Sequence, residues 1–194
     1  MRIRFSQLSV RPVLVPVLAV LLAVSGCSAS DKLAVPTSAP GAENSAESIP
    51  AIPMGVKADR ILVDKSDRIL VLFKGDEEIT RYHNIRFGDA PDGHKRFEGD
   101  ERTPEGTYTI DARNPSSSYH LSLRISYPNA VDRAYAEASG KSPGGDIFIH
   151  GQPNGYDGAP IARDWTDGCI ALSNAEIEQI WDVVPDGVEI VIQP

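Results

Sequence analysis

The chain has 194 residues, of which 41% are hydrophobic, and its formal net charge is −8. That length accommodates one domain of ordinary size together with a terminal extension. The acidic balance argues against nucleic acid and anionic lipid as partners. The chain has two cysteines, Cys27 and Cys169. Cys27 has an explanation of its own, so Cys169 has no evident disulfide partner.

The first residues have the pattern of an export signal. Three arginines precede the almost wholly apolar segment 13–24, which is shorter than a typical membrane span and is followed by small residues. Val24-Ser25-Gly26-Cys27 resembles the lipobox of bacterial lipoproteins. That resemblance implies a signal peptide over residues 1–26 and lipidation of Cys27. An ordinary signal peptide with a chance cysteine is the alternative.

These signals also predict a location. In a bacterium with two membranes, Ser28 after the lipidated cysteine implies sorting to the outer membrane, so we expect an exported protein at the periplasmic face of that membrane. Removing residues 1–26 removes three arginines and no acid, which takes the formal charge from −8 to −11. Acyl chains rather than a basic patch would then supply the membrane attachment.

Residues 27–56 are predicted to be the lipidated cysteine and a flexible tether. Segment 28–55 contains four prolines, many alanines and serines, and no aromatic residue. Such a composition buries too little apolar surface to offset the entropy of ordering the chain. The remaining residues, 57–194, are predicted to form one catalytic domain.

Within that domain, short runs rich in β-branched residues outnumber helical patterns. The sequence predicts strands at 60–64, 68–73, 79–83, 107–110, 119–125, 147–150 and 188–192, with a long loop over 88–106. A short helix is predicted over 130–139. A second helix begins at Ser173, where Ser173 and Glu176 have capping-box spacing, and ends before Pro185. We therefore expect a mostly-β sandwich or barrel with one or two helices.

The chemistry that the residues offer is centred on Cys169. Acyl transfer by a thiol needs a base, donors for the oxyanion, and close access to the sulfur. His150, at the end of a predicted strand, can serve as the base, and the amides of Gly168 and Cys169 can serve as the donors. Gly168 also leaves room for a substrate beside the sulfur. The same residue types fit a buried small hydrophobe and a core histidine equally well.

The spacing of these residues resembles a known family. His150, separated by 15 residues from Thr166-Asp167-Gly168-Cys169, resembles the signature of YkuD-type L,D-transpeptidases. The turn Thr103-Pro104-Glu105-Gly106 is similar to one that precedes a strand in these domains, and Ile149-His150-Gly151 matches as well. The resemblance covers residues 58–192.

The resemblance implies a β-rich domain whose nucleophile, Cys169, takes an acyl group from a diaminopimelate-containing stem peptide of peptidoglycan. It implies His150 as the base, oriented by a backbone carbonyl rather than by an acidic side chain. Gly151, Thr166, Asp167 and Arg163 are the expected substrate contacts. The implied process is cell wall biogenesis, which determines cell shape.

The motif departs from the common family signature at two positions. Asp167 replaces a second histidine, and Ala171 replaces an arginine that often follows. Trp-Thr-x-Gly-Cys-Ile-Ala instead resembles a divergent branch that includes the enzyme detaching Braun-type lipoprotein from peptidoglycan. An L,D-amidase or endopeptidase that hydrolyses crosslinks or peptidoglycan–lipoprotein links is therefore the first alternative to transpeptidation.

Two further hypotheses stay open, a non-catalytic cell-wall-binding lipoprotein and a cysteine protease that digests proteins. No metal site is predicted, because no close ligand pair has zinc spacing, and no cofactor motif is found. His94 lies in a charged loop and is expected to be solvated, whereas His120, in a predicted strand, could face the cleft. Asp164 is expected to form a surface ion pair.

Overall fold

The computed structural model describes residue 49 and residues 51–194. The predicted signal peptide, Cys27 and most of the predicted tether lie outside these residues. Of the tether residues that are described, Ile52 packs partly buried against the core. No helix in the described part of the chain is long and apolar enough to cross a membrane.

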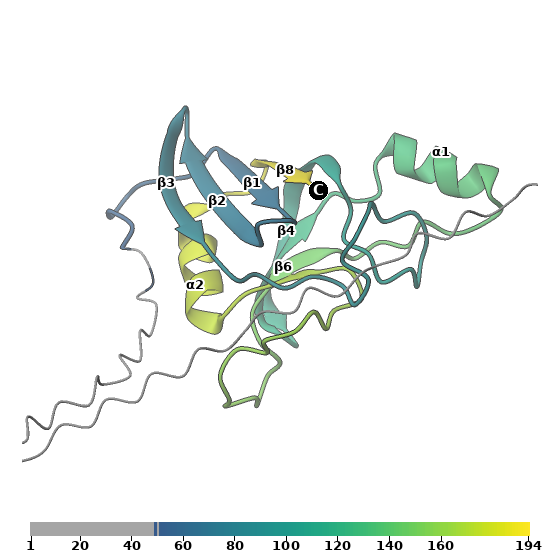
Figure 1. Ribbon diagram of the computed structural model, residues 1–194. Helices are drawn as coiled ribbons and strands as arrows, with labels where there is room; N and C mark the ends of the chain where they lie inside the picture. Colours follow the sequence, from purple (N-terminus) through teal and green to yellow (C-terminus); the bar gives the residue numbers. More distant parts are fainter. Residues whose placement is uncertain (1–48, 50) are drawn as a thin grey trace, which may run out of the picture. The chain divides into compact units, whose positions relative to one another are not determined.

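The mostly-β class with two helices is confirmed (Figure 1). The strands are β1 (Arg60–Asp64), β2 (Ile69–Lys74), β3 (Glu77–Tyr82), β4 (Gly106–Ser117), β5 (His120–Ile125), β6 (Phe148–His150), β7 (Ile170–Ala171) and β8 (Glu189–Gln193). The helices are α1 (Ala130–Ala138) and α2 (Asn174–Val183). Along the sheet the strands follow the order β3-β2-β1-β8-β4-β5-β6-β7.

The first and last strands of the domain are neighbours in this sheet. β1 pairs with β2 in an antiparallel hairpin and on its other side pairs in parallel with β8. Strand β8 in turn pairs antiparallel with the first residues of β4. Since β8 is enclosed on both sides, its alternate residues Ile190 and Ile192 are buried.

The long strand β4 joins the two halves of the sheet. Residues 106–109 pair with β8, and residues 110–117 pair with β5. The sequence predicts only 107–110 as strand, because the continuation is polar and contains Pro115. Pairing there is irregular, with a register shift between Asn114 and Ser117. This irregular end of the hairpin reaches the candidate active site.

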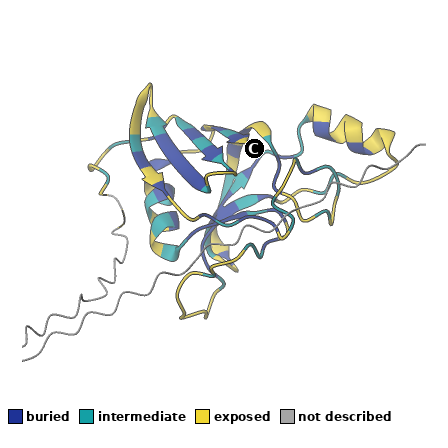
Figure 2. Cartoon of the chain, in the orientation of Figure 1, coloured by how far each residue is buried: buried dark blue, intermediate teal, exposed yellow. Residues whose placement is uncertain are grey.

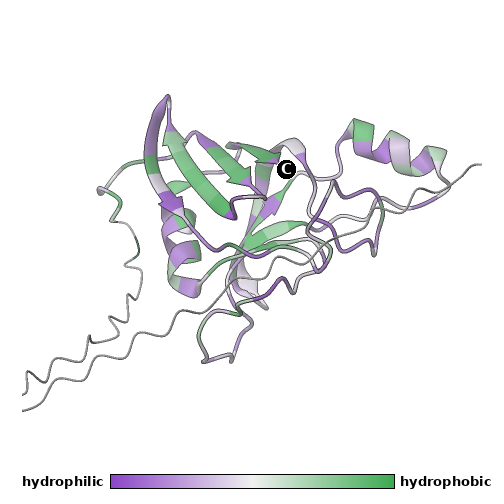
Figure 3. Cartoon of the chain, viewed as in Figure 1, coloured by the Kyte–Doolittle hydropathy of each residue, from purple (hydrophilic) through white to green (hydrophobic). Residues whose placement is uncertain are grey.

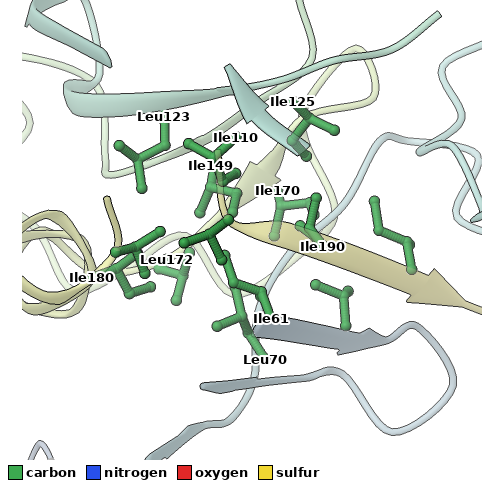
Figure 4. Close-up of a cluster of buried hydrophobic side chains, with 14 of the residues drawn as sticks. Ile61, Leu70, Ile110, Leu123, Ile125, Ile149, Ile170, Leu172, Ile180 and Ile190 are labelled. Atoms are coloured by element: carbon green, nitrogen blue, oxygen red, sulfur yellow. The ribbon is translucent and has the colours of Figure 1, made fainter. Parts of the chain in front are cut away.

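The core lies between the sheet and α2. Strand β2 is hydrophobic along most of its length (Figure 3) and is buried there (Figure 2). Ile180 of α2 packs into the same cluster as Ile61 and Leu70 (Figure 4). The predicted capping box starts this helix, because the side chains of Ser173 and Glu176 each accept a hydrogen bond from the other's backbone N–H.

Helix α1 corrects the expectation for His94. The carboxylate of Asp132, in the first turn of α1, is buried and accepts a hydrogen bond from Tyr108 Oη at 3.0 Å. His94 Nε2 lies 3.0 Å from the other carboxylate oxygen, and the Glu105 amide donates to His94 Nδ1 at 2.8 Å. His94 is therefore not solvated, because a buried carboxylate requires donors around it.

Candidate active site

The turn that carries Cys169 is held by Thr166. The Thr166 hydroxyl donates to the Cys169 carbonyl at 2.8 Å and accepts from the Gly168 amide at 3.2 Å. Thr166 also forms an isolated parallel β-bridge with Gly88, which lies in the loop between β3 and β4. Directly after Cys169 the chain enters β7, which pairs with β6. The sulfur is thus placed between two short backbone pairings.

Gly168 is required by the protein's own packing. Its φ of 124° is unfavourable for a residue with a side chain, and a Cβ there would lie 2.5 Å from the Arg102 carbonyl oxygen. The sequence predicts that a substrate would occupy the space beside Gly168. In the structure, the loop that contains Arg102 and the predicted Thr103–Gly106 turn fills it.

His150, the last residue of β6, is 3% exposed. Its Nδ1 lies 2.7 Å from the Gly151 carbonyl oxygen, which can only accept, so Nδ1 carries the proton and Nε2 is left unprotonated in the neutral ring. A backbone carbonyl thus orients the imidazole, as the family resemblance implies. Burial lowers the pKa of His150 to about 4, although the hydrogen bond to Gly151 opposes the shift.

Cys169 is hydrogen-bonded to the main chain rather than to the imidazole. Its Sγ accepts from the Phe148 amide at 3.4 Å and donates to the Asp146 carbonyl at 3.6 Å. Burial raises the pKa of the thiol to about 11; the Phe148 amide lowers it and the nearby Asp167 carboxylate raises it. Burial therefore disfavours the charged forms of both Cys169 and His150, and the pair is neutral at rest.

Both side chains line one cavity of about 480 Å³. Part of the wall is formed by the turn with Trp165, Thr166 and Asp167, and a second part by the β4–β5 hairpin end with Asn114, Ser117, Ser118 and Tyr119. The residues of this hairpin end are not predicted as site residues from the sequence. The available signal was the run of three serines before Tyr119, a cluster of small polar residues beside an aromatic ring at a turn.

The other predicted site residues take different positions. Thr166 and Asp167 line the cavity, and Asp167 is exposed there. Gly151 is buried behind His150, where a Cβ would lie 2.6 Å from Asn174 Oδ1, and Arg163 is exposed and not part of the cavity wall. Neither is therefore placed to contact a substrate in this cavity.

The neighbours of these residues are also positioned differently from the expectations. Asp164 forms a two-pronged ion pair with Arg68 at 2.7 and 2.8 Å and accepts from the Phe87 amide, so it braces the turn from behind. His120 does not face the cavity; its Nε2 lies 2.6 Å from Glu178 on α2. Among the described residues, no cluster of His, Cys, Asp or Glu side chains could hold a metal ion.

The fold and the cysteine–histidine cavity define a class of protein, and the comparison with family models agrees. Residues 58–192 match the model YkuD, described as the L,D-transpeptidase catalytic domain. The chain belongs to this family.

Individual relatives are more distant. Over 94 aligned residues, the chain is 33% identical to YafK of Escherichia coli strain K12. The aligned segment covers 47% of this chain and 32% of YafK. The chain thus spans about a third of this curated relative.

Two solved structures resemble the fold. The helical cell shape determining protein Pgp2 of Campylobacter jejuni is 30% identical with a TM-score of 0.57, over 72% of this chain and 48% of that one. Bd1075 of Bdellovibrio bacteriovorus is 28% identical with a TM-score of 0.50, over 71% and 48% of the two chains.

Proposed function

We propose that this domain modifies peptidoglycan as an L,D-transpeptidase, with Cys169 as nucleophile and His150 as the group that accepts and returns the proton. The observation that carries the proposal is that a thiol and an imidazole with a free Nε2 line the same cavity. Family membership supports the substrate class, stem peptides that contain diaminopimelate.

The first half-reaction forms an acyl-enzyme. His150 Nε2 takes the thiol proton as Sγ bonds to the carbonyl carbon of the stem peptide. The tetrahedral intermediate then breaks its C–N bond, and His150 returns the proton to the leaving amine. Because the resting pair is neutral, the proton moves during the attack rather than before it.

The hydrogen bonds of the free protein change which backbone amides we expect to bind the oxyanion. The Gly168 amide already donates to Thr166, whereas the Cys169 amide makes no hydrogen bond within the described residues. We therefore assign the Cys169 amide as the principal oxyanion donor. The Asp167 carboxylate is exposed on the cavity wall, and we place it near an ammonium group of the substrate.

In the second half-reaction, an amine or water takes the acyl group from Cys169. Attack by an amine gives transpeptidation, and attack by water gives the amidase or endopeptidase reaction.

The chemistry needs no metal and no cofactor. We place it in cell wall biogenesis, at the periplasmic face of an outer membrane to which Cys27 ties the chain. A role in cell shape would parallel the description of Pgp2.

The test is incubation of the full chain with purified tetrapeptide muropeptides, followed by mass spectrometry. Wild type should convert them, and Cys169→Ala and His150→Gln should reduce conversion by at least about a hundredfold. The matched control is His83→Gln, because His83 is exposed and is not part of the cavity wall. It should retain wild-type conversion.

Adding a free amine acceptor to the assay distinguishes transpeptidation from hydrolysis. New products that contain free diaminopimelate or a D-amino acid would identify a transferase, and shortened peptides alone would identify a hydrolase. Equal product profiles for wild type and Cys169→Ala would refute the catalytic assignment. That result would favour a non-catalytic cell-wall-binding protein, a reading with which the raised pKa of Cys169 is compatible.

A further inference from the structure

Tyr119 holds the His150–Gly151 unit in two ways. Its ring stacks against the imidazole with 4.6 Å between ring centroids and 33° between planes. Its backbone carbonyl accepts a hydrogen bond from the Gly151 amide at 3.0 Å. The carbonyl of that same Gly151 orients the imidazole by accepting from Nδ1. Tyr119 therefore contacts both the imidazole ring and Gly151, the residue whose carbonyl fixes the tautomer of that ring.

Tyr119 also separates His150 from water. Tyr119 is 40% exposed and its ring lies against that of His150, which is only 3% exposed, so Tyr119 is one of the side chains that bury the imidazole. Trp165 packs near both rings, with centroid distances of 5.7 Å to Tyr119 and 5.6 Å to His150. Trp165 lies in the turn that leads to Cys169 (the nucleophile turn), whereas Tyr119 lies in the turn between β4 and β5.

The β4–β5 turn is in turn fastened by Asn154, in the loop after β6. The Asn154 amide donates to the Ser118 carbonyl, and its side-chain nitrogen donates to the Ser117 carbonyl, both at 2.9 Å. Its side-chain oxygen accepts from the His120 amide at 2.9 Å. The turn includes His120 with a φ of 67°, a conformation that needs such support. Asn154 is absent from the cavity wall.

We propose that Tyr119 is a positioning residue for His150, which it shields from water and holds in the Nδ1–H tautomer, and that Asn154 fixes Tyr119 in that place. This inference rests on the proposed function only for the use made of His150. The contacts themselves are properties of the free protein.

The surroundings of His150 favour this assignment. The titratable groups that line the cavity with His150 are the Cys169 thiol, the Tyr119 phenol and the carboxylates of Asp146 and Asp167. On α2, Glu178 is engaged by His120. No described acid forms an ion pair with His150, and burial is the largest cause of its lowered pKa. Removing the tyrosine ring should therefore raise that pKa toward the value of about 6.5 for an exposed histidine.

The experiment is an NMR titration of the full chain labelled with ¹⁵N in histidine, in which His150→Gln identifies the His150 signals. The imidazole ¹⁵N shifts report both protonation and tautomer. In wild type, His150 should stay neutral and protonated on Nδ1 down to a pH near 4. Tyr119→Ala should raise its pKa by about one unit or more and populate the other tautomer.

Three other variants make the result specific. Tyr119→Phe keeps the ring and should leave the titration of His150 unchanged. Asn154→Ala loses two hydrogen bonds of the turn and should shift the pKa in the same direction as Tyr119→Ala, by less. Tyr135→Ala is the matched control, because Tyr135 is similarly exposed, at 47%, but lies on α1.

A folded Tyr119→Ala chain with wild-type pKa and tautomer would overturn the proposal. An equal shift in Tyr119→Phe or in Tyr135→Ala would also overturn it, since the ring would then not be the cause. If Tyr119→Ala does not fold, Asn154→Ala decides, and an unshifted His150 in that variant is the negative result. The titration uses no substrate, so it can succeed even if the muropeptide assay fails.

Discussion

At the scale of single residues, burial favours the uncharged forms of both Cys169 and His150. Low exposure raises the pKa of Cys169 to about 11 and lowers that of His150 to about 4. Both groups are therefore neutral across the physiological range. For a protein predicted to be exported, this protects the thiol from oxidation, which proceeds through the thiolate.

This neutral state predicts how the thiol responds to pH. In a Cys27→Ser chain, where Cys169 is the only thiol, alkylation by iodoacetamide should rise about tenfold for each pH unit between about pH 7 and 10, without a plateau. The sign follows from the raised pKa, because the thiolate fraction keeps growing until the pH reaches the pKa. The measurement is the rate of mass increase.

A chain that lacks both cysteines gives the background for that rate. A plateau beginning below about pH 7 would show a thiolate–imidazolium pair at rest and would contradict the neutral state. Asp167→Asn offers a check in the opposite direction. Removing the nearby carboxylate should lower the pKa of Cys169 and speed alkylation at a fixed pH.

At the scale of elements, the nucleophile turn depends on a loop far away in sequence. The loop between β3 and β4 brings the Arg102 carbonyl against Gly168 and bridges Gly88 to Thr166. Asp164, paired with Arg68, supports the start of the turn. The position of the sulfur is therefore set by several backbone contacts rather than by the turn alone.

Gly168→Ala should reveal this dependence. The positive φ costs about 1–2 kcal/mol for a residue with a side chain, and the contact with the Arg102 carbonyl should bring the loss to about 3 kcal/mol or more. Gly187→Ala is the matched control, since Gly187 has a φ of 87° but no atom within 4 Å of a Cβ. Urea unfolding measures both, and equal losses would show that the Arg102 contact relaxes without cost.

Local sequence patterns predicted the elements better than they predicted the site. The strands around 60–73 and the helix from Ser173 have strong periodicity or capping, and both are confirmed. The second half of β4 was missed because Pro115 and neighbouring polar residues hide its pairing. The contacts of Tyr119 and Asn154 are not predictable from local patterns, because they join the β4–β5 turn, the end of β6 and the loop after β6, which meet only in the folded chain.

At the scale of the whole molecule, the pairing of β1 with β8 could not be read from either strand. Each is a short apolar run that would satisfy many partners, and their parallel register is selected only when the complete core forms. The pairing of Cys169 with His150 was easier to predict. Their spacing resembles that of a known family, and the resemblance implies a fold that brings the two residues together. The neutral charge state was not predictable in this way, since it depends on burial that only the folded chain creates.

The place of β8 predicts that the C-terminal strand is indispensable for folding. Deleting residues 188–194 removes buried Val188, Ile190 and Ile192 and leaves β1 and β4 without a shared neighbour. Losing three such side chains costs more than about 6 kcal/mol, which approaches the whole stability of a typical domain. We expect no cooperative urea transition in circular dichroism. Deleting only the exposed Pro194 should leave the transition intact, and a cooperative transition in the longer deletion would show that the two halves of the sheet fold independently.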